Sequence, residues 1–384
     1  MTRIHQLVAG FRTGDAISAE AEALDAVFKA HGCGSAIWCA PRNTAEDARG
    51  RVNDLATLAP AVAPSDIAIL HLSIGSPAND VFRSLKCRKA IIYHNVTPAR
   101  FFERCNAPLA KILEEGRRAV AQLAGAAETN LGVSAYNAGE LAEMGYANPR
   151  VFPLVVDTGF GGAADAPMRD ALAADGAFNV LFVGRVVPNK RHDKLLEVIA
   201  HLRRLEPRAR LVIAGSSSGN EAYKVILRKA ASEMGLGVSA FWSGGAARHT
   251  GVADLDGKFD AVVFTEFLKP SELNACYASA SAFLCMSEHE GFCAPLLEAM
   301  HWDVPVFAQA AAAVPETLDG AGVLFDGADS AQIAETILRV TRDAQLREAV
   351  LENQRARLAR FKARDIWNEI STLLELPDGK PEKQ

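Results

Sequence analysis

The sequence predicts an α/β protein with two doubly wound parallel-sheet domains in tandem. Short runs of β-branched and apolar residues alternate with longer stretches of helical periodicity, which is typical of repeated strand–helix units around a parallel sheet. The chain has 384 residues, which is about the length of two ordinary domains. A Gly-, Ala- and Asp-rich stretch without apolar periodicity interrupts the pattern at 158–176, and a linker is expected there.

The first Rossmann-like domain is expected at 1–157. Its predicted strands are 4–8, 35–39, 67–71, 89–93, 129–133 and 151–155, with helices at 16–30 and 108–123.

The second Rossmann-like domain is expected at 177–355. Its predicted strands are 179–183, 209–214, 260–264, 282–286, 304–308 and 322–325. Residues 331–376 show a helical pattern throughout. The apolar positions around Trp367 and Ile370 require a surface to pack on. A frayed, flexible tail is expected at 377–384.

Composition excludes several classes of protein. The chain carries 41 Lys and Arg against 46 Asp and Glu, a net charge of −5, so nucleic acid is not an expected partner. Seven cysteines without a C-x-x-C pair indicate reduced thiols and neither a zinc motif nor a disulfide framework. Because signal-peptide and membrane-span patterns are absent, a cytoplasmic protein is expected. The basic face at 201–210 leaves peripheral contact with the inner face of the membrane open.

The most informative segment places two carboxylates around the start of a helix. Glu290 follows the predicted strand at 282–286, Pro295 occupies a favoured first-turn position, and Glu298 lies about one turn into the helix. The N-terminus of a helix attracts phosphate, and neighbouring carboxylates accept hydrogen bonds from sugar hydroxyls. This combination predicts a nucleotide-sugar site.

Other strand ends supply cations and a close backbone approach. The strand at 179–183 ends at Gly184, and Arg185 and Lys190 in the following loop are suited to neutralise a diphosphate. In the first domain, Gly14 permits the backbone to approach a phosphate, and His94 follows the strand at 89–93. Since ligands of such folds bind at the carboxyl ends of the strands, the function is expected in a cleft between the domains.

The motifs resemble a known family. Gly-Arg-x-x-Pro-x-Lys at 184–190, together with Glu-x7-Glu at 290–298, resembles the retaining glycosyltransferases of family 4, which have the GT-B fold. The resemblance extends over the chain through the segments 134–137, 304–306 and 315–317. The segments 14–18 and 93–98 look like the members that build bacterial surface polysaccharides, such as lipopolysaccharide, with mannose or rhamnose units.

The resemblance implies a role for each matching residue. Arg185 and Lys190 would hold the donor diphosphate, Glu298 the ribose hydroxyls, and Glu290 the hydroxyls of the transferred sugar. The other implied donor contacts are Gly184, the backbone of Phe292, Cys293 and Ala294, the loop at Gly14, and His94, which would approach the sugar from the first domain. Many members carry glycine where this chain has Cys293.

The resemblance also implies the reaction. Two domains facing each other across a cleft, with the helix at 356–376 crossing back to the first domain, would transfer a hexose from a nucleoside diphosphate sugar such as GDP-mannose. The acceptor would be a saccharide or a lipid-linked saccharide. No cofactor or metal is expected, because the protein positions the reactants and stabilises charge while the leaving diphosphate assists the incoming hydroxyl.

Two alternatives remain open at this point. Gly-Ser-Ser-Ser-Gly at 215–219 fits the nucleophile elbow of a serine hydrolase, with Ser217 as nucleophile and His249 or His289 as its base. A nucleotide-sugar-binding protein without catalytic activity would keep the same fold and motifs. Asp15 is interpreted as a helix N-cap, and Cys285 is interpreted as a packing residue.

Overall fold

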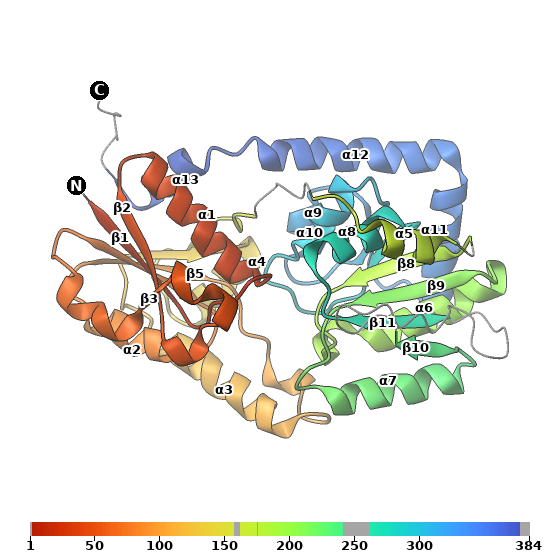
Figure 1. Cartoon of the computed structure of the whole chain (residues 1–384), viewed down its shortest axis with the longest axis horizontal. Helices are drawn as coiled ribbons and strands as arrows, with labels where there is room; N and C mark the ends of the chain where they lie inside the picture. Colours follow the sequence, from red (N-terminus) through yellow and green to blue (C-terminus); the bar gives the residue numbers. More distant parts are fainter. Residues whose placement is uncertain (1, 157–161, 175, 241–260, 377–384) are drawn as a thin grey trace. The chain divides into compact units, whose positions relative to one another are not determined.

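The protein folds into two units, each built on a seven-stranded parallel sheet (Figure 1). The computed structural model describes residues 2–156, 162–174, 176–240 and 261–376. Unit 1 contains the described residues of 2–100, 108–156 and 363–376, and unit 2 contains those of 101–107 and 162–362. The predicted fold class is confirmed, since both sheets are parallel and belong to separate α/β units.

The sheet of unit 1 has the strand order β3-β2-β1-β4-β5-β6-β7. The strands are β1 (Arg3–Val8), β2 (Gly34–Cys39), β3 (Asn53–Asp54), β4 (Ile67–Leu72), β5 (Arg88–Tyr93), β6 (Thr129–Gly132) and β7 (Arg150–Val151). From β1 the chain builds the sheet toward β3, and from β4 it builds in the opposite direction. Ligands of open α/β sheets bind beside such a switch in direction, which here falls between β1 and β4.

The sheet of unit 2 repeats this arrangement with the order β10-β11-β9-β8-β12-β13-β14. The strands are β8 (Phe178–Val183), β9 (Ala209–Ala214), β10 (Val238–Ala240), β11 (Val262–Glu266), β12 (Ala282–Cys285), β13 (Val306–Gln309) and β14 (Val323–Phe325). Its switch point falls between β8 and β12, which pair through Val180 with Ala282 and Leu181 with Phe283.

Helices connect the strands and cover the sheets. Those of unit 1 are α1 (Ala16–Ala30), α2 (Pro77–Ser84), α3 (Ala107–Ala121), α4 (Ala135–Glu143) and α13 (Ile366–Leu373); those of unit 2 are α5 (Ala166–Ala173), α6 (His192–Leu205), α7 (Glu221–Glu233), α8 (Pro270–Ala278), α9 (Pro295–His301), α10 (Val314–Leu318), α11 (Ser330–Arg342) and α12 (Ala344–Lys362). Because parallel crossovers are right-handed, connections that run in opposite directions place α1 and α2 on opposite faces of the first sheet (Figure 1).

Each sheet is buried between its helices by an apolar core. In unit 1, Leu7, Leu70 and Tyr93 of the central strands pack with Phe82 of α2. The core of unit 2 is built from side chains of β8, β9, α6 and α11, among them Phe182, Ile199, Leu211 and Ile337. Strands buried on both faces read as continuous apolar runs, which is why the sequence shows them clearly.

The expected linker is partly helical, which the sequence prediction did not anticipate. Helix α5 lies inside 158–176, and Asp165 caps it by accepting a hydrogen bond from the Met168 N–H at 2.9 Å. Met168 and Leu172, four positions apart, are its buried residues. Two apolar positions are too few to produce a visible period, so the polar composition of the segment concealed the helix.

A short segment from the first half of the sequence belongs to unit 2. Residues 101–107 join that unit, where Cys105 packs against the apolar core and the Asn106 side chain donates to the Gly219 carbonyl at 2.7 Å. The sequence prediction placed this segment in the first domain, because no local pattern shows that it packs on a distant part of the chain.

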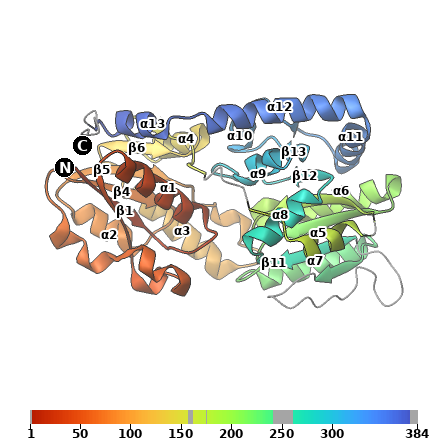
Figure 2. The ribbon, with the colours of Figure 1, turned by 45° about the horizontal axis from the view of Figure 1, so that its top comes forward.

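The C-terminal helical region consists of three helices instead of one. Helix α12 packs on α9 within unit 2 (Figure 2), and the chain passes into unit 1 at residue 363, later than the expected boundary at 355. In unit 1, α13 packs on α1, and the ring of Trp367 stacks on His31 with centroids 4.3 Å apart. Arg364 donates to the Pro153 carbonyl at 2.9 Å. The predicted tail at 377–384 lies outside the described residues.

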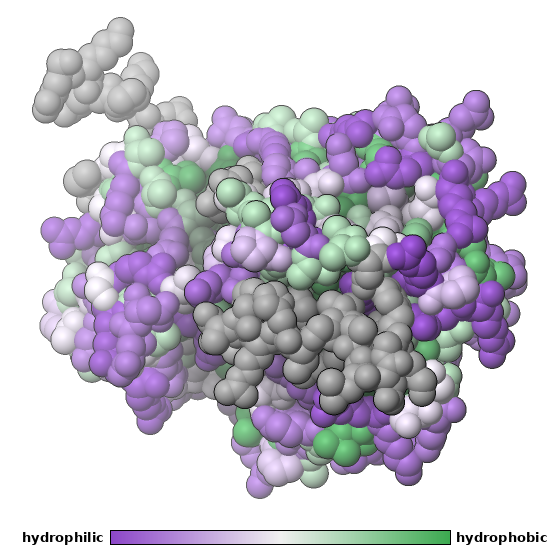
Figure 3. Space-filling model, turned by 45° about the vertical axis from the view of Figure 1, so that its right-hand side comes forward, coloured by the Kyte–Doolittle hydropathy of each residue, from purple (hydrophilic) through white to green (hydrophobic). Residues whose placement is uncertain are grey.

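No helix within the described ranges is long and apolar enough to cross a membrane. On the face drawn in Figure 3, hydrophilic residues predominate and hydrophobic ones form small separate patches. Arg210, which the sequence prediction placed on a basic face, is fully buried and donates to the Asn179 side chain at 3.3 Å. It therefore contributes nothing to a basic surface at 201–210.

Candidate functional site

Lys190 and Glu290 meet at the switch point of the second sheet. Lys190 ends the short helical turn that follows β8, and Glu290 lies in the loop after β12. The Lys190 ammonium lies 2.5 Å from Oε1 of Glu290, and both side chains are largely withdrawn from solvent. Because β8 and β12 are neighbours in the sheet, their C-terminal loops emerge side by side and bring two residues of distant sequence position together.

Asn189 forms hydrogen bonds that join the loop after β8 to the loop after β12. Its side-chain amide donates to the His289 carbonyl at 3.1 Å, and its own carbonyl accepts from the Glu288 N–H at 2.9 Å. Asn189 is itself buried. These two hydrogen bonds hold the residues that precede Lys190 against those that precede Glu290, so the ion pair is supported by backbone contacts.

The electrostatic state of the pair follows from its burial. Burial alone would lower the pKa of Lys190, but the adjacent Glu290 carboxylate more than offsets this effect, and the pKa is raised. Lys190 therefore carries a full positive charge at neutral pH. A cation held at a strand end is suited to bind a diphosphate.

Gly184 and Arg185 occupy the same loop as Lys190. A Cβ atom at Gly215, which follows β9, would meet the Gly184 carbonyl oxygen at 2.0 Å, so the two strand ends can approach only because Gly215 lacks a side chain. The Arg185 side chain is exposed. Within the described residues it makes no ion pair, and the structure does not bring it to the Lys190–Glu290 pair.

The loop at 292–294 has an unusual backbone. Cys293 has φ = +73°, a conformation that favours glycine. Cysteine therefore stands at a backbone position where glycine would be unstrained. In the part of the chain that the structure describes, the N–H groups of Cys293 and Ala294 donate to no protein acceptor, whereas the Phe292 carbonyl accepts from the Thr317 hydroxyl.

Glu298 is held by a tyrosine. The Tyr277 hydroxyl of α8 donates to the Glu298 carboxylate at 2.6 Å. Burial raises the pKa of Glu298, and the tyrosine hydrogen bond opposes this effect only in part. Glu298 lies in α9, which follows the Glu290 loop, and its partner in the structure is Tyr277, which the sequence prediction did not include.

In unit 1, the loop after β1 has the conformation expected for its glycine. Gly14 has φ = +78° and is exposed in the turn that precedes α1. Asp15 caps α1 by accepting from the N–H and hydroxyl of Ser18 at 2.9 and 2.8 Å, as predicted. The turn therefore requires glycine at position 14 for a local reason, whether or not a phosphate binds there.

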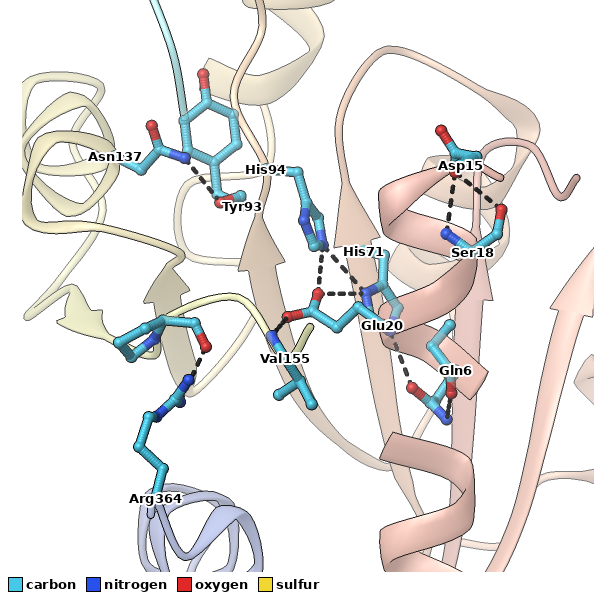
Figure 4. Close-up of polar contacts among 12 residues, drawn as sticks. Gln6, Asp15, Ser18, Glu20, His71, Tyr93, His94, Asn137, Val155 and Arg364 are labelled. Carbon is cyan, nitrogen blue, oxygen red and sulfur yellow. Dashed lines mark hydrogen bonds and ion pairs between the residues drawn. The ribbon is translucent and has the colours of Figure 1, made fainter. Parts of the chain in front are cut away.

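His94 belongs to a buried polar cluster at the switch point of the first sheet (Figure 4). Its Nε2 atom lies 3.1 Å from Nδ1 of His71 and 3.2 Å from Oε2 of Glu20. Nε2 of His71 contacts the side-chain amide oxygen of Gln6 at 3.0 Å. The other carboxylate oxygen of Glu20 accepts a hydrogen bond from the Val155 N–H at 2.8 Å. The sequence prediction identified His94 but missed its partners.

Burial governs the charges of this cluster. It lowers the pKa of His94 to about 4, although the Glu20 carboxylate acts in the opposite direction. For Glu20, burial raises the pKa, but His94 and His71 more than offset this effect and the pKa is lowered. Glu20 is therefore a carboxylate and His94 a neutral imidazole at neutral pH.

Ser217 does not have the surroundings of a hydrolase nucleophile. Its hydroxyl donates to the Glu266 carboxylate at 2.9 Å, its N–H donates to the same carboxylate, and Lys224 pairs with Glu266 from α7. The predicted nucleophile elbow calls for a histidine that takes the proton of this hydroxyl. His249, one proposed base, lies outside the described residues, and His289 lies in the loop after β12, where its ring contacts Phe101.

Comparison with known proteins agrees with this geometry. Residues 177–343, which span the second sheet, match the family described as glycosyl transferases group 1. The matched segment lies in unit 2 and includes Lys190, Glu290 and Glu298.

Curated relatives of the chain are glycosyltransferases. It is 32% identical over 209 residues to D-inositol 3-phosphate glycosyltransferase of Frankia alni, covering 52% of this chain and 46% of the relative. It is 31% identical over 175 residues to the GDP-mannose-dependent alpha-(1-6)-phosphatidylinositol monomannoside mannosyltransferase of Mycolicibacterium smegmatis, covering 43% and 39%. The chain thus spans about half the length of the curated relatives it matches.

The two-unit architecture is that of solved GT-B structures. The crystal structure of Anabaena Alr3699/HepE in complex with UDP and glucose superposes with a TM-score of 0.68 over 98% of this chain and 100% of that chain, at 16% identity. At this identity the likeness concerns the fold, and it confirms the predicted GT-B class.

Proposed function

We propose that the chain is a retaining glycosyltransferase that transfers a hexose from a nucleoside diphosphate sugar. The observation that carries the proposal is the Lys190–Glu290 pair at the switch point of the second sheet, in the segment that matches the glycosyl transferases group 1. In open α/β sheets this is the place where ligands bind, and the pair presents one cation and one hydrogen-bond acceptor together.

The proposed roles follow from charge and exposure. Lys190 and the exposed Arg185 neutralise the donor diphosphate, and the N–H groups of Cys293 and Ala294 provide further donors for it. Glu290 accepts hydrogen bonds from hydroxyls of the transferred sugar. Tyr277 orients Glu298, and Glu298 accepts from the ribose hydroxyls.

The transfer is proposed to need neither metal nor cofactor. The donor diphosphate leaves and assists deprotonation of the incoming hydroxyl on the same face of the sugar, which retains the anomeric configuration. The protein contributes by placing the reactants and by stabilising the negative charge that develops on the diphosphate. His94 of unit 1 is proposed to approach the sugar.

The donor is proposed to be GDP-mannose or a related GDP-sugar, and the acceptor a saccharide or lipid-linked saccharide of a surface polysaccharide. The name of the Mycolicibacterium relative supports this donor. Phe267, which is 67% exposed in the segment between β11 and α8, offers a flat apolar ring on which a base can stack. Synthesis at the cytoplasmic face of the membrane is part of the same proposal.

Donor binding can be tested first by thermal shift. GDP, UDP, ADP and dTDP and their sugar conjugates are compared, because a ligand that binds only the folded protein raises its unfolding temperature. A shift with the guanine compounds alone supports the proposed donor, whereas a shift with another base replaces it. If every nucleotide leaves the unfolding temperature unchanged, the donor-site assignment is wrong.

Substitutions test which lysine binds the nucleoside diphosphate. Lys190→Ala is expected to abolish the shift given by the nucleoside diphosphate, because the diphosphate loses its buried cation. Lys194→Ala is the matched control, since Lys194 lies four residues away and pairs with Glu197 on the surface of α6. Equal shifts in both variants would remove Lys190 from the site.

A turnover assay distinguishes the proposed enzyme from a nucleotide-sugar-binding protein without catalytic activity. Release of nucleoside diphosphate from the donor is followed in the presence of saccharide acceptors, and the anomeric configuration of the product is read by nuclear magnetic resonance. Donor binding without release, over a panel of acceptors, would favour the non-catalytic alternative. An inverted product would exclude the retaining mechanism.

A further inference from the structure

The polar cluster of unit 1 contains two residues, Glu20 and His71, that have no role in the proposed glycosyl transfer. Glu20 of α1 and His71 of β4 are fully buried, and His94 after β5 is nearly so. We propose that Glu20, His71 and His94 form a binding site for a divalent transition-metal ion of the zinc class. The site uses no residue of unit 2, and of the residues in the proposed function it shares only His94.

The three atoms that face one another have the spacing of metal ligands. Nδ1 of His71, Nε2 of His94 and Oε2 of Glu20 form a triangle with sides of 3.1, 3.2 and 3.6 Å (Figure 4). Bonds of about 2.0–2.2 Å to a tetrahedral zinc ion place its ligand atoms about 3.3–3.6 Å apart. A cation can therefore lie within bonding distance of all three atoms with little movement of the side chains.

The hydrogen bonds around His71 determine which of its nitrogens faces the cluster. The Gln6 amide donates to the Ala21 carbonyl at 2.9 Å, so its oxygen faces His71, and Nε2 of His71 donates to it. Nδ1 is therefore the nitrogen that faces Nε2 of His94 and the Glu20 carboxylate.

The carboxylate oxygen is the atom left without a donor. Oε2 of Glu20 is buried and, among the described residues, receives no hydrogen bond of normal geometry. A buried acceptor without a partner is destabilising, and for a carboxylate the cost is higher than for a neutral group. A cation between the three atoms would partner the carboxylate and bind both imidazoles at once.

The surroundings orient each ligand as they do in metal sites. The side-chain amide of Gln6 on β1 fixes the tautomer of His71, and the backbone N–H of Val155 holds the second oxygen of Glu20. Such outer contacts set the direction of the ligand lone pairs and raise metal affinity. Glu20 and His71 also come from a helix and a central strand, which keep the distances fixed.

The ligand types define the class of ion. Two imidazoles and one carboxylate leave one position open, as in zinc sites that keep a water molecule. Imidazole ligands favour zinc and its neighbours over Mg²⁺ or Ca²⁺, which prefer oxygen. Zn²⁺ is therefore expected to bind and Mg²⁺ is not.

Calorimetric titration of the chelator-treated full chain with Zn²⁺ tests the proposal. A second possible ligand cluster, Cys285, Glu290 and Cys293, is removed first by the substitutions Cys285→Ser and Cys293→Ser. One Zn²⁺ per chain is expected, and Glu20→Gln and His71→Gln are each expected to weaken binding by at least about tenfold. Gln6→Leu, which leaves all three ligands in place, is expected to weaken it about 10- to 100-fold.

A matched control comes from the same sheet. His5 on β1 and Asp66 form another buried histidine–carboxylate pair, 3.2 Å apart, and His5→Gln should leave the Zn²⁺ affinity unchanged. Equal affinities in His5→Gln and Glu20→Gln would overturn the proposal. So would the absence of Zn²⁺ binding to the parent protein.

A spectrum of the Cys285→Ser/Cys293→Ser protein, with Glu20, His71 and His94 intact, covers the case in which a ligand variant fails to fold. Co²⁺ bound by two imidazoles and a carboxylate gives the intense visible bands of tetrahedral cobalt without thiolate charge-transfer absorption, and Zn²⁺ should abolish these bands. A thiolate-type or octahedral spectrum would overturn the assignment. These measurements use no sugar donor, so their outcome is independent of the proposed transferase activity.

Discussion

The Lys190 ammonium lies 2.5 Å from the Glu290 carboxylate, although the two residues are 100 positions apart in the sequence. In the protein without ligand, each is the charge partner of the other. A diphosphate that binds here therefore competes with Glu290 for Lys190. The pair is expected to open when the donor binds, so that Glu290 can turn to the sugar hydroxyls.

This competition predicts opposite effects of Glu290→Gln on binding and on turnover. The variant frees Lys190, so a nucleoside diphosphate without sugar should bind as tightly as before or more tightly. Transfer from the complete donor should fall by more than about tenfold, because a charge-assisted hydrogen bond of about 1.5–3 kcal/mol is lost. Titration calorimetry and donor-turnover assays measure the two quantities.

Lys190→Ala provides the contrast, because it should weaken nucleoside diphosphate binding as well as turnover. The double variant Lys190→Ala/Glu290→Gln should bind no better than Lys190→Ala alone. If Glu290→Gln loses nucleoside diphosphate affinity to the same degree as Lys190→Ala, the two residues do not compete as described.

A second prediction concerns the stability of unit 2 in acid. Burial, reinforced by the nearby Lys190, lowers the pKa of His192 from 6.5 to about 3. In the unfolded chain, His192 binds a proton below its ordinary pKa of about 6.5, whereas in the folded protein it stays neutral at that pH. The free energy of unfolding therefore decreases as the pH falls. Between about pH 6 and pH 4, this residue alone removes roughly 1.4 kcal/mol per pH unit.

The substitution His192→Phe tests this, because the imidazole packs edge-on against Phe182 with centroids 4.8 Å apart and an aromatic ring can replace it. Urea unfolding is compared at several pH values. The variant should lose less stability on acidification than the parent protein, whereas parallel pH profiles would show that His192 is not the titrating group.

A third prediction concerns the left-handed backbone at Cys293. At φ = +73° a β-branched side chain is strongly disfavoured, so Cys293→Val should reduce the free energy of unfolding by about 2 kcal/mol or more. Cys293→Gly removes the backbone strain but also a buried thiol, and its effect should be smaller. If valine is tolerated as well as glycine in chemical unfolding, the loop does not adopt this backbone in solution.

A fourth prediction uses two glycines in different surroundings. Gly215→Ala places a methyl group 2.0 Å from the Gly184 carbonyl, which forces β8 and β9 apart at their ends and should destabilise the protein by about 3 kcal/mol or more. Gly139→Ala is the control, since this helical position in α4 has no atom within 4 Å of a new Cβ. It should stabilise the protein by up to about 1 kcal/mol, as measured by thermal unfolding.

Strands buried on both faces were the most predictable part of the fold. The predicted strand at 209–214 coincides with β9 (Ala209–Ala214), and the predicted helix at 16–30 coincides with α1. The two-residue strand β3 and the edge strand β10 were missed, because such short edge elements bury too few side chains to produce a pattern. Helix α5 was missed for the same reason.

The candidate site was predictable where its residues lie in one motif. Lys190 and Glu290 could be found from loops that follow apolar strands, and Glu298 from the helix that follows the Glu290 loop. Tyr277 could not, because nothing in its local sequence indicates that its hydroxyl reaches the Glu298 carboxylate on another helix.

In unit 1, the sequence indicated even fewer of the residues that the structure brings together. His94 was predicted because it follows a buried strand, whereas Glu20 reads as one acid among many on an amphipathic helix. Only the packing of α1 against the sheet reveals that its side chain is fully buried beside two histidines. The cysteine spacing indicated only that a zinc motif of local sequence is absent, and it carries no information about ligands brought together from different elements.

The sequence by itself determined the class of fold and the order of the motifs, because apolar periodicity and strand-end loops are local properties of the chain. The tertiary structure alone decided which charges are partners: Lys190 with Glu290, Tyr277 with Glu298, and Glu20 with His71 and His94. The physical reason is the order of the strands. The switch in direction between β1 and β4, and between β8 and β12, brings together loops that are far apart in sequence, and no local pattern encodes that order.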